Sequence, residues 1–373
     1  MTVPKRHLRR CAVATVQVLV LSLSFTPTVL AVITDGENAS NVLGQSNFTS
    51  GGFATTQAGM YDPSGAIYDA TGNRLFVADI NNSRVLVFDV TSISDGQNAV
   101  HVLGQSNFTS GGGATTQSGM GGPDGGAYDA TGKRLFVAET GNNRVLVFDV
   151  TSISDGQNAV HVLGQSNFTS GGTATTQAGM HTPNGMAYDA TGNRLFVADA
   201  NNNRVLVFDV TSISDGQNAV HVLGQSNFTS NGFATTQAGM HTPSDVAYDG
   251  TGKRLFVADA GNNRVLVFDM TSISDGQNAV HVLGQSNFTS GGTATTQAGM
   301  YTPGGMAYDA TGKRLFVTDI GNNRLLVFNN AEADGGGQVP FFSWWSLSLL
   351  LAACGFVVQR EGLLSELFSE PRL

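Results

Sequence analysis

Aromatic and imidazole side chains recur at one position of a 60-residue repeat, where they are well placed to do chemistry. The position holds Tyr61, Gly121, His181, His241 and Tyr301. Imidazole is a common metal ligand, but a catalytic zinc site takes three protein ligands around one ion, and this set offers two histidines. We therefore predict no metal and no cofactor here. His181 and His241 are interpreted either as loop residues at a wet rim or as ligand contacts.

A second histidine position recurs in the last strand expected in each repeat. Ligands of one ion must all lie about 2 Å from it, and outer strands of different units diverge from one another. No metal site is expected at this position. Its members are His101, His161, His221 and His281, with Asn41 as the fifth.

A carboxylate and an arginine flank an Asn-rich turn in every unit. Such a pair braces a turn through charge-assisted hydrogen bonds, and its presence in all five units favours a structural role over a single active site. The five predicted braces are Asp79 with Arg84, Glu139 with Arg144, Asp199 with Arg204, Asp259 with Arg264 and Asp319 with Arg324.

Differences between the repeats are concentrated in loops, whereas the expected strands are nearly identical. Loops on a rigid scaffold often carry binding residues, so these positions are the candidate ligand-binding rim. Drift in unconstrained loops explains the same variation, and the sequence does not separate the two. The candidate rim residues are Tyr61, His181, His241, Tyr301, Phe53 and Phe233.

Each unit reads as four short strands separated by turn signals. The middle strands are apolar on both faces and rich in β-branched and aromatic residues, which favours strands buried on both sides. Four antiparallel strands per unit, with sheets packed face to face, predict a β-propeller; a solenoid would need polar end caps. The strands expected in the first unit are residues 65–68, 74–78, 84–90 and 99–103.

The repeats begin and end partway through a unit. Residues 35–45 match a fourth strand, and the last unit stops after its third strand near Asn329. We therefore expect an all-β, five-bladed propeller over residues 32–330, closed by a blade that the two ends share, since closure removes open sheet edges. The units are residues 61–105, 121–165, 181–225, 241–285 and 301–329, the last completed by 35–45.

The string from Pro63 to Phe88 resembles the NHL repeat. It carries the family's P-x-G, L-F-V-A-D and R-V-L-V-F segments, and the match recurs at Pro123, Pro183, Pro243 and Pro303. The VLGQ and FTS segments look like the linker of secreted bacterial members. The resemblance implies a propeller, usually six-bladed, that presents a binding surface. Five units imply either a five-bladed ring or six blades completed from elsewhere.

Both ends of the chain predict export and membrane attachment. Residues 1–31 have a basic start, an apolar stretch and small residues before a cleavage site, typical of a signal peptide. Residues 331–338 form a Gly-rich linker, and 339–358 are 20 uncharged, mostly apolar residues, long enough for a transmembrane helix. A tail, 359–373, follows. An uncleaved N-terminal anchor, a buried C-terminal helix and a C-terminal sorting signal remain alternatives.

Charge and cysteine content exclude several classes. The chain has 19 Lys and Arg against 28 Asp and Glu, a net charge of −9, and its expected signal holds four of the basic residues. An acidic domain repels phosphate backbones, so we expect no nucleic-acid partner. Both cysteines, Cys11 and Cys354, lie in the apolar ends, which leaves the repeats no disulfide or thiol chemistry.

The function expected from the sequence is that of an exported, membrane-anchored scaffold at the cell envelope or surface. It would bind a protein, glycan or envelope ligand through its rim loops, without catalysis. The alternative is a propeller lyase or hydrolase with a site at the axial mouth near His181 and His241. Active sites need unique residues held in one place, and the near-identical blades offer no clear set. The ligand itself is not encoded in any recognisable motif.

Overall fold

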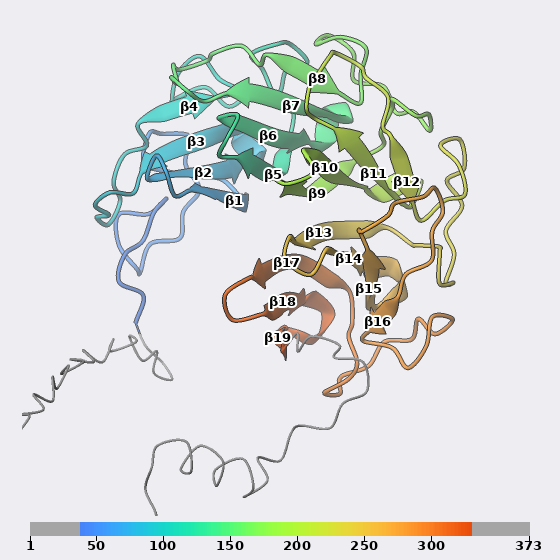
Figure 1. Ribbon diagram of the computed structural model, residues 1–373. Helices are drawn as coiled ribbons and strands as arrows, with labels where there is room; N and C mark the ends of the chain where they lie inside the picture. Colours follow the sequence, from blue (N-terminus) through green and yellow to red (C-terminus); the bar gives the residue numbers. More distant parts are fainter. Residues whose placement is uncertain (1–37, 330–373) are drawn as a thin grey trace, which may run out of the picture. The chain divides into compact units, whose positions relative to one another are not determined.

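The structure, a computed structural model, describes residues 38–329, and those from Asn41 onward belong to one compact unit (Figure 1). The unit is all-β and five-bladed, as the sequence predicted. The predicted signal peptide, linker, transmembrane helix and tail lie outside the described residues. Within residues 38–329, no helix is long and apolar enough to cross a membrane.

The first blade is a four-stranded antiparallel sheet. It consists of β1 (Pro63–Asp69), β2 (Arg74–Asp79), β3 (Arg84–Asp89) and β4 (His101–Leu103), in that order from the inside outward. The expected Asn-rich turn is a short 3-10 helix, η1 (Ile80–Asn82), which ends at Ser83 in the left-handed region. The four expected strands are confirmed, with boundaries shifted by up to two residues.

The other blades repeat this plan, with three strands described for blade 5. Blade 2 contains β5 (Pro123–Asp129), β6 (Arg134–Glu139), η2 (Thr140–Asn142), β7 (Arg144–Asp149) and β8 (His161–Leu163). Blade 3 contains β9 (Pro183–Asp189), β10 (Arg194–Asp199), η3 (Ala200–Asn202), β11 (Arg204–Asp209) and β12 (His221–Leu223). Blade 4 contains β13 (Pro243–Asp249), β14 (Arg254–Asp259), η4 (Ala260–Asn262), β15 (Arg264–Asp269) and β16 (His281–Leu283). Blade 5 contains β17 (Pro303–Asp309), β18 (Arg314–Asp319), η5 (Ile320–Asn322) and β19 (Arg324–Asn329).

The core lies between the blades, which explains the unbroken apolar runs. One face of β2 and β3 turns Phe76, Val85 and Val87 toward the next blade, where they join one buried cluster with Leu135 and Phe148. In blades 2 to 5 the opposite face packs on the preceding blade in the same way. Every middle strand from β6 to β15 is therefore covered on both sides, so it has no polar alternate positions.

A second ion pair, not recognised from the sequence, ties the β1–β2 turn to the neighbouring blade. Asp69 accepts backbone hydrogen bonds from Thr71 and Gly72 and pairs with Arg74 at 2.6 Å. Burial alone would raise the pKa of Asp69, but these hydrogen bonds outweigh it and hold the pKa well below its ordinary value. Arg74 also donates to the Val150 carbonyl of blade 2 at 2.7 Å, so one side chain fixes a turn and a seam.

The expected shared blade is not formed, which corrects the prediction of a closed ring. Within residues 38–329, sheet β17–β18–β19 has no fourth strand, and the expected donor, from Asn41 onward, lies against blade 1. There Gly96 donates to the Val42 carbonyl, and Leu43 packs beside Phe88. The repeat identified which segment matches the missing strand, but a repeat in sequence does not specify the rotation per blade that would close a ring.

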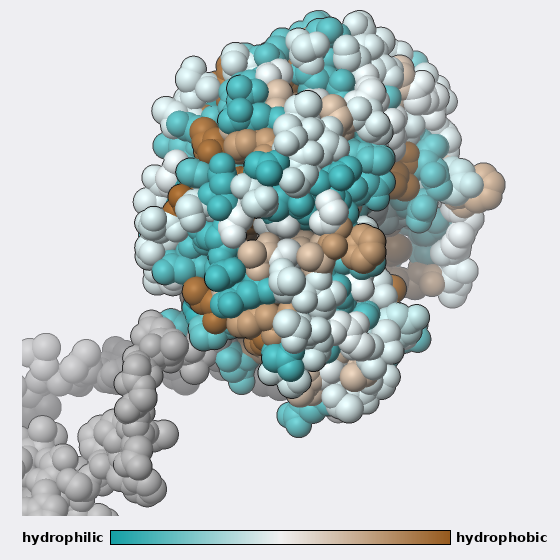
Figure 2. All heavy atoms as spheres, turned by 90° about the vertical axis from the view of Figure 1, so that its right-hand side faces the viewer, coloured by the Kyte–Doolittle hydropathy of each residue, from teal (hydrophilic) through white to brown (hydrophobic). Residues whose placement is uncertain are grey.

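One face of blade 5 is open because, within residues 38–329, no further blade packs on it. Leu325 and Val327 are 55% and 51% exposed, whereas their counterparts Val205 and Val207 in blade 3 are fully buried. By contrast, the side of the molecule at the right of Figure 1 is mostly hydrophilic, with apolar side chains in small separate patches (Figure 2). Blade 5 therefore carries an interblade surface without its neighbouring blade.

Candidate functional site

The innermost strands of all five blades line a central cavity of about 600 Å³, as expected for a propeller axis. Its polar lining includes Ser64, Asp124, Asn184 and Ser244, one from each of the first four blades. The strands approach closely because glycine follows the first three of these residues: a Cβ on Gly65 would lie 2.3 Å from the Asp124 carbonyl oxygen. At these glycines the backbones of neighbouring blades therefore lie in close contact beside the cavity.

Asp245 departs from the glycine that the other four blades hold at its position, and it lines this cavity. Its carboxylate accepts hydrogen bonds from the backbone N–H of Val246, at 2.8 Å, and of Met306 in blade 5, at 2.6 Å. Burial raises the pKa of Asp245 to about 7, the Asp124 charge adds to the rise, and the two hydrogen bonds oppose it. Sequence reasoning missed this residue, although a single aspartate in a column of glycines was a visible signal.

The candidate rim residues lie outside the cavity and come together in pairs within their own blades. Phe53 stacks on Tyr61 with ring centroids 4.5 Å apart, and Phe233 stacks on His241 at 4.6 Å. The two phenylalanines remain 74% and 68% exposed. The rim therefore presents two exposed aromatic pairs, one on blade 1 and one on blade 4.

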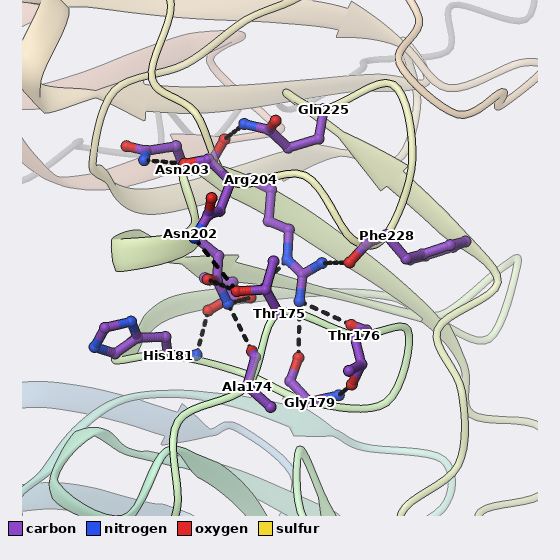
Figure 3. Close-up of polar contacts among 12 residues, drawn as sticks. Ala174, Thr175, Thr176, Gly179, His181, Asn202, Asn203, Arg204, Gln225 and Phe228 are labelled. Atoms are coloured by element: carbon purple, nitrogen blue, oxygen red, sulfur yellow. Dashed lines mark hydrogen bonds and ion pairs between the residues drawn. The ribbon is translucent and has the colours of Figure 1, made fainter.

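The remaining rim residues are not brought into the same place. Tyr301 lies over Gly321 in blade 5, and the His181 ring points away from the polar network beneath it (Figure 3). Neither His181 nor His241 lines the central cavity. Among residues 38–329, no three His, Cys, Asp or Glu side chains gather as metal ligands would.

A hollow of about 420 Å³ adjoins the first aromatic pair. Its lining includes Phe53 and Tyr61 with the loop residue Gly52, the apolar Leu43 and the amide side chain of Asn81. An aromatic wall beside amide and backbone polar groups suits a ligand with both apolar and hydrogen-bonding surface.

The predicted carboxylate–arginine pairs are in contact, and they do more than brace a turn (Figure 3). Arg204 is fully buried and donates from Nε to Asp199 at 2.7 Å. Its other nitrogens donate to the Phe228 carbonyl in the loop after blade 3 and to the Thr176 and Gly179 carbonyls in the loop before it. One guanidinium thus joins a strand to two connecting loops.

The same carboxylate positions the rim. Asp199 accepts from the His181 backbone N–H at 2.6 Å and from the Asn202 side chain at 2.9 Å. Asp79 and Asp259 hold Tyr61 and His241 in the same way. The backbone at each rim position is fixed by a buried network, while the side chain is free to differ between blades.

The brace of blade 5 is incomplete. Arg324 keeps its contacts to Asp319, Thr296 and Gly299, but among the described residues it makes no contact to a phenylalanine carbonyl like that of the other four arginines. Those four contacts are Arg84 with Phe108, Arg144 with Phe168, Arg204 with Phe228 and Arg264 with Phe288.

The fourth-strand histidines form interblade contacts that sequence reasoning missed. His101 Nδ1 lies 3.2 Å from Asp155 of the next blade, and His161 and His221 repeat the contact with Asp215 and Asp275. The constant separation of 54 residues was present in the sequence, but its meaning depends on knowing that consecutive blades are adjacent.

Comparison with known proteins gives one family and a distant structural likeness. The NHL repeat matches residues 180–208 and 240–268, which include most of the three inner strands of blades 3 and 4. No curated protein matches the chain. A chain of a crystal structure of a nidogen/laminin complex is similar over 73% of this chain and 78% of its own length, with 16% identity and a TM-score of 0.44. That likeness carries no argument about function.

Replacing a complete brace should cost more than replacing the incomplete one. Arg204→Ala leaves the buried Asp199 charge and three carbonyls without their donor, and we expect a loss of about 3–5 kcal/mol in the free energy of unfolding. Arg324→Ala, at a site 28% exposed, should cost about 1–2 kcal/mol. Urea unfolding followed by circular dichroism measures both. Equal losses would contradict the incomplete brace.

Asp245 should make stability depend on pH. The folded chain keeps a proton that the unfolded chain releases above pH 4, so the contribution of Asp245 to stability falls as pH rises from about 4 to about 7. Asp245→Asn should remove this fall. Melting temperatures of both proteins across that range provide the test, and identical pH profiles would refute the assignment.

Proposed function

Because the chain is built of NHL repeats folded into a five-bladed β-propeller, we propose that it is a binding scaffold that holds a protein or glycan ligand on its rim loops. NHL propellers often mediate protein binding. The observation that carries the proposal is the pair of exposed aromatic stacks, Phe53 with Tyr61 and Phe233 with His241. Both stacks stand on backbone that buried braces fix in place.

Phe53 and Phe233 are the two most exposed large apolar side chains among the described residues. Aromatic rings contribute large apolar area with few rotatable bonds, so they are effective anchors in binding surfaces. The hollow beside Phe53 adds hydrogen-bonding groups, including Asn81, that would orient a ligand. The positions that vary between blades thus include the ones best suited to recognition.

Two features favour a scaffold over a lyase or hydrolase. His181 and His241, the residues of the alternative enzyme site, sit on different blades and away from the central cavity. The His241 ring is stacked on Phe233. A catalytic site requires a nucleophile or base held beside its orienting partner in one cleft.

We place this scaffold outside the cell and attached to a membrane. The proposal rests on the signal-like residues 1–31 and on the uncharged, mostly apolar residues 339–358. The acidic charge of the repeats supports a protein or glycan partner rather than nucleic acid.

Removing the aromatic anchors should weaken ligand binding without unfolding the propeller. A glycan array and a panel of purified envelope proteins would identify the ligand, and binding to Phe53→Ala/Phe233→Ala would then be measured by calorimetry. We expect at least about a tenfold loss of affinity. His281→Ala, on the exposed outer strand β16, is the matched control and should bind normally. Unchanged binding by the double variant would exclude this rim surface.

Membrane attachment has its own test. The full chain should sediment with membranes and require detergent for release, whereas a variant lacking residues 339–358 should be soluble. A full chain that is already soluble, or a deletion variant that remains in the membrane fraction, would show the anchor to be wrong while leaving the binding proposal intact.

A further inference from the structure

In the part of the chain that the structure describes, no fourth strand pairs with β19 of blade 5. In the four complete blades the third strand pairs with the fourth in one register, for example Val205 with Leu223 and Val207 with His221. The counterparts in β19 are Leu325 and Val327, and β19 pairs only with β18. An unpaired strand edge flanked by exposed apolar side chains is a template for strand addition.

The open face of blade 5 lacks its aromatic contact as well. In each of the four formed seams a phenylalanine of one blade meets a tyrosine of the next: Phe76 with Tyr128, Phe136 with Tyr188, Phe196 with Tyr248 and Phe256 with Tyr308. The fifth such pair would be Phe316 with Tyr68. Among the described residues neither ring has a ring partner, and Tyr68 is 56% exposed.

The carboxylate–arginine brace of blade 5 also indicates a fourth strand and the loop that follows it. Arg324 lacks a phenylalanine carbonyl, and in every other blade that carbonyl follows the fourth strand by five residues. The segment Asn41–Leu43 has Phe48 at this distance, and Phe48 is 53% exposed. The free edge of β19, the exposed apolar face of blade 5 and the guanidinium of Arg324 would therefore all be satisfied by a segment with the sequence of a fourth strand and the loop after it.

The chain carries that segment at its other end. Asn41-Val42-Leu43-Gly44-Gln45 repeats the His-Val-Leu-Gly-Gln of the complete blades with one substitution, and it belongs to no sheet in the structure. It remains on blade 1, where Val42 accepts from Gly96. Each molecule thus exposes both a strand acceptor and a matching strand donor, and they do not meet within the chain.

We propose that blade 5 binds the N-terminal segment Asn41–Leu43 of a second copy of this chain. The donor strand adds to the free edge of β19 with Leu43 opposite Leu325 and Asn41 opposite Val327, the register of the complete blades. Phe48 of the second copy then supplies the carbonyl that Arg324 lacks. The contact is head-to-tail, since donor and acceptor are different surfaces of one molecule.

The contacts within the four complete blades indicate that the strand bound to β19 comes from a second copy of this chain. Its segment has the sequence, spacing and side-chain pattern that four blades of this chain already accept. Main-chain hydrogen bonds along an edge give affinity, and side chains at alternate positions give specificity. Here Leu43 would pack beside Leu325, which is exposed in the single chain.

Cysteine crosslinking between two separately tagged proteins tests the proposal. Both are full-length chains with Cys11→Ser and Cys354→Ser; one carries Asn41→Cys and the other Val327→Cys. Opposed residues in paired strands have Cβ atoms about 5 Å apart, within reach of a short thiol-specific crosslinker. We expect a crosslinked dimer only when the two proteins are mixed. Adding Leu325→Asp to the second protein should reduce the dimer about tenfold, because it places a charge in an apolar contact.

Two controls make the result decisive. Val207→Cys, at the equivalent position in the complete blade 3, should give no dimer with Asn41→Cys, because β12 already occupies that edge. A single chain with both Asn41→Cys and Val327→Cys should also form dimers. Crosslinking only within that chain would overturn the proposal in favour of a ring closed by its own segment. No crosslink in either experiment would overturn it as well.

Discussion

The buried arginine of each unit is the interaction on which the rest of the propeller depends. Taking a guanidinium and a carboxylate out of water is costly, and the pair becomes tolerable only when the remaining donors and acceptors are satisfied. Arg204 meets this condition with Asp199 and three loop carbonyls. Because these partners come from the strand and from the loops on either side, one side chain fixes their relative positions. The long polar loops can then be ordered without an apolar core of their own.

This arrangement separates the conserved geometry of the repeat from its variable surface. The brace holds the backbone at each rim position, so Tyr61, Gly121, His181, His241 and Tyr301 occupy equivalent sites despite their different chemistry. At the propeller axis the residue type is restricted instead, because close backbone contacts at Gly65 and Gly125 exclude larger residues. Asp245 is accommodated there by hydrogen bonds to Val246 and Met306. Equivalent positions of different blades can thus hold different residue types at the rim, whereas few residue types fit at the axis.

Sequence reasoning was most accurate where one unit contains all the relevant information. The strand boundaries, the axial position of the first strands and the pairing of Asp79 with Arg84 follow from local patterns and period. Contacts between units were missed: the His101–Asp155 pair and the Arg74 contact to Val150 join residues 54 and 76 positions apart, and only the packed blades bring them together. The prediction that the ring closes was wrong for a related reason. The phase of the repeat matched residues 35–45 to blade 5, but the angle between blades arises from packing in the seams, which the sequence pattern does not specify.

The three-stranded blade at the end of the series has a consequence for how the molecule opens. In an array whose units contact only their neighbours, stability is approximately a sum of unit and seam contributions. Blade 5 has one seam where blades 2, 3 and 4 have two, and its sheet has lost a strand and part of a brace. Its local unfolding free energy is therefore the lowest of these four blades, and fraying begins there. Among blades 2 to 5 we therefore expect unfolding to begin at β19 and blade 5 to separate from blade 4 before the inner blades separate from one another.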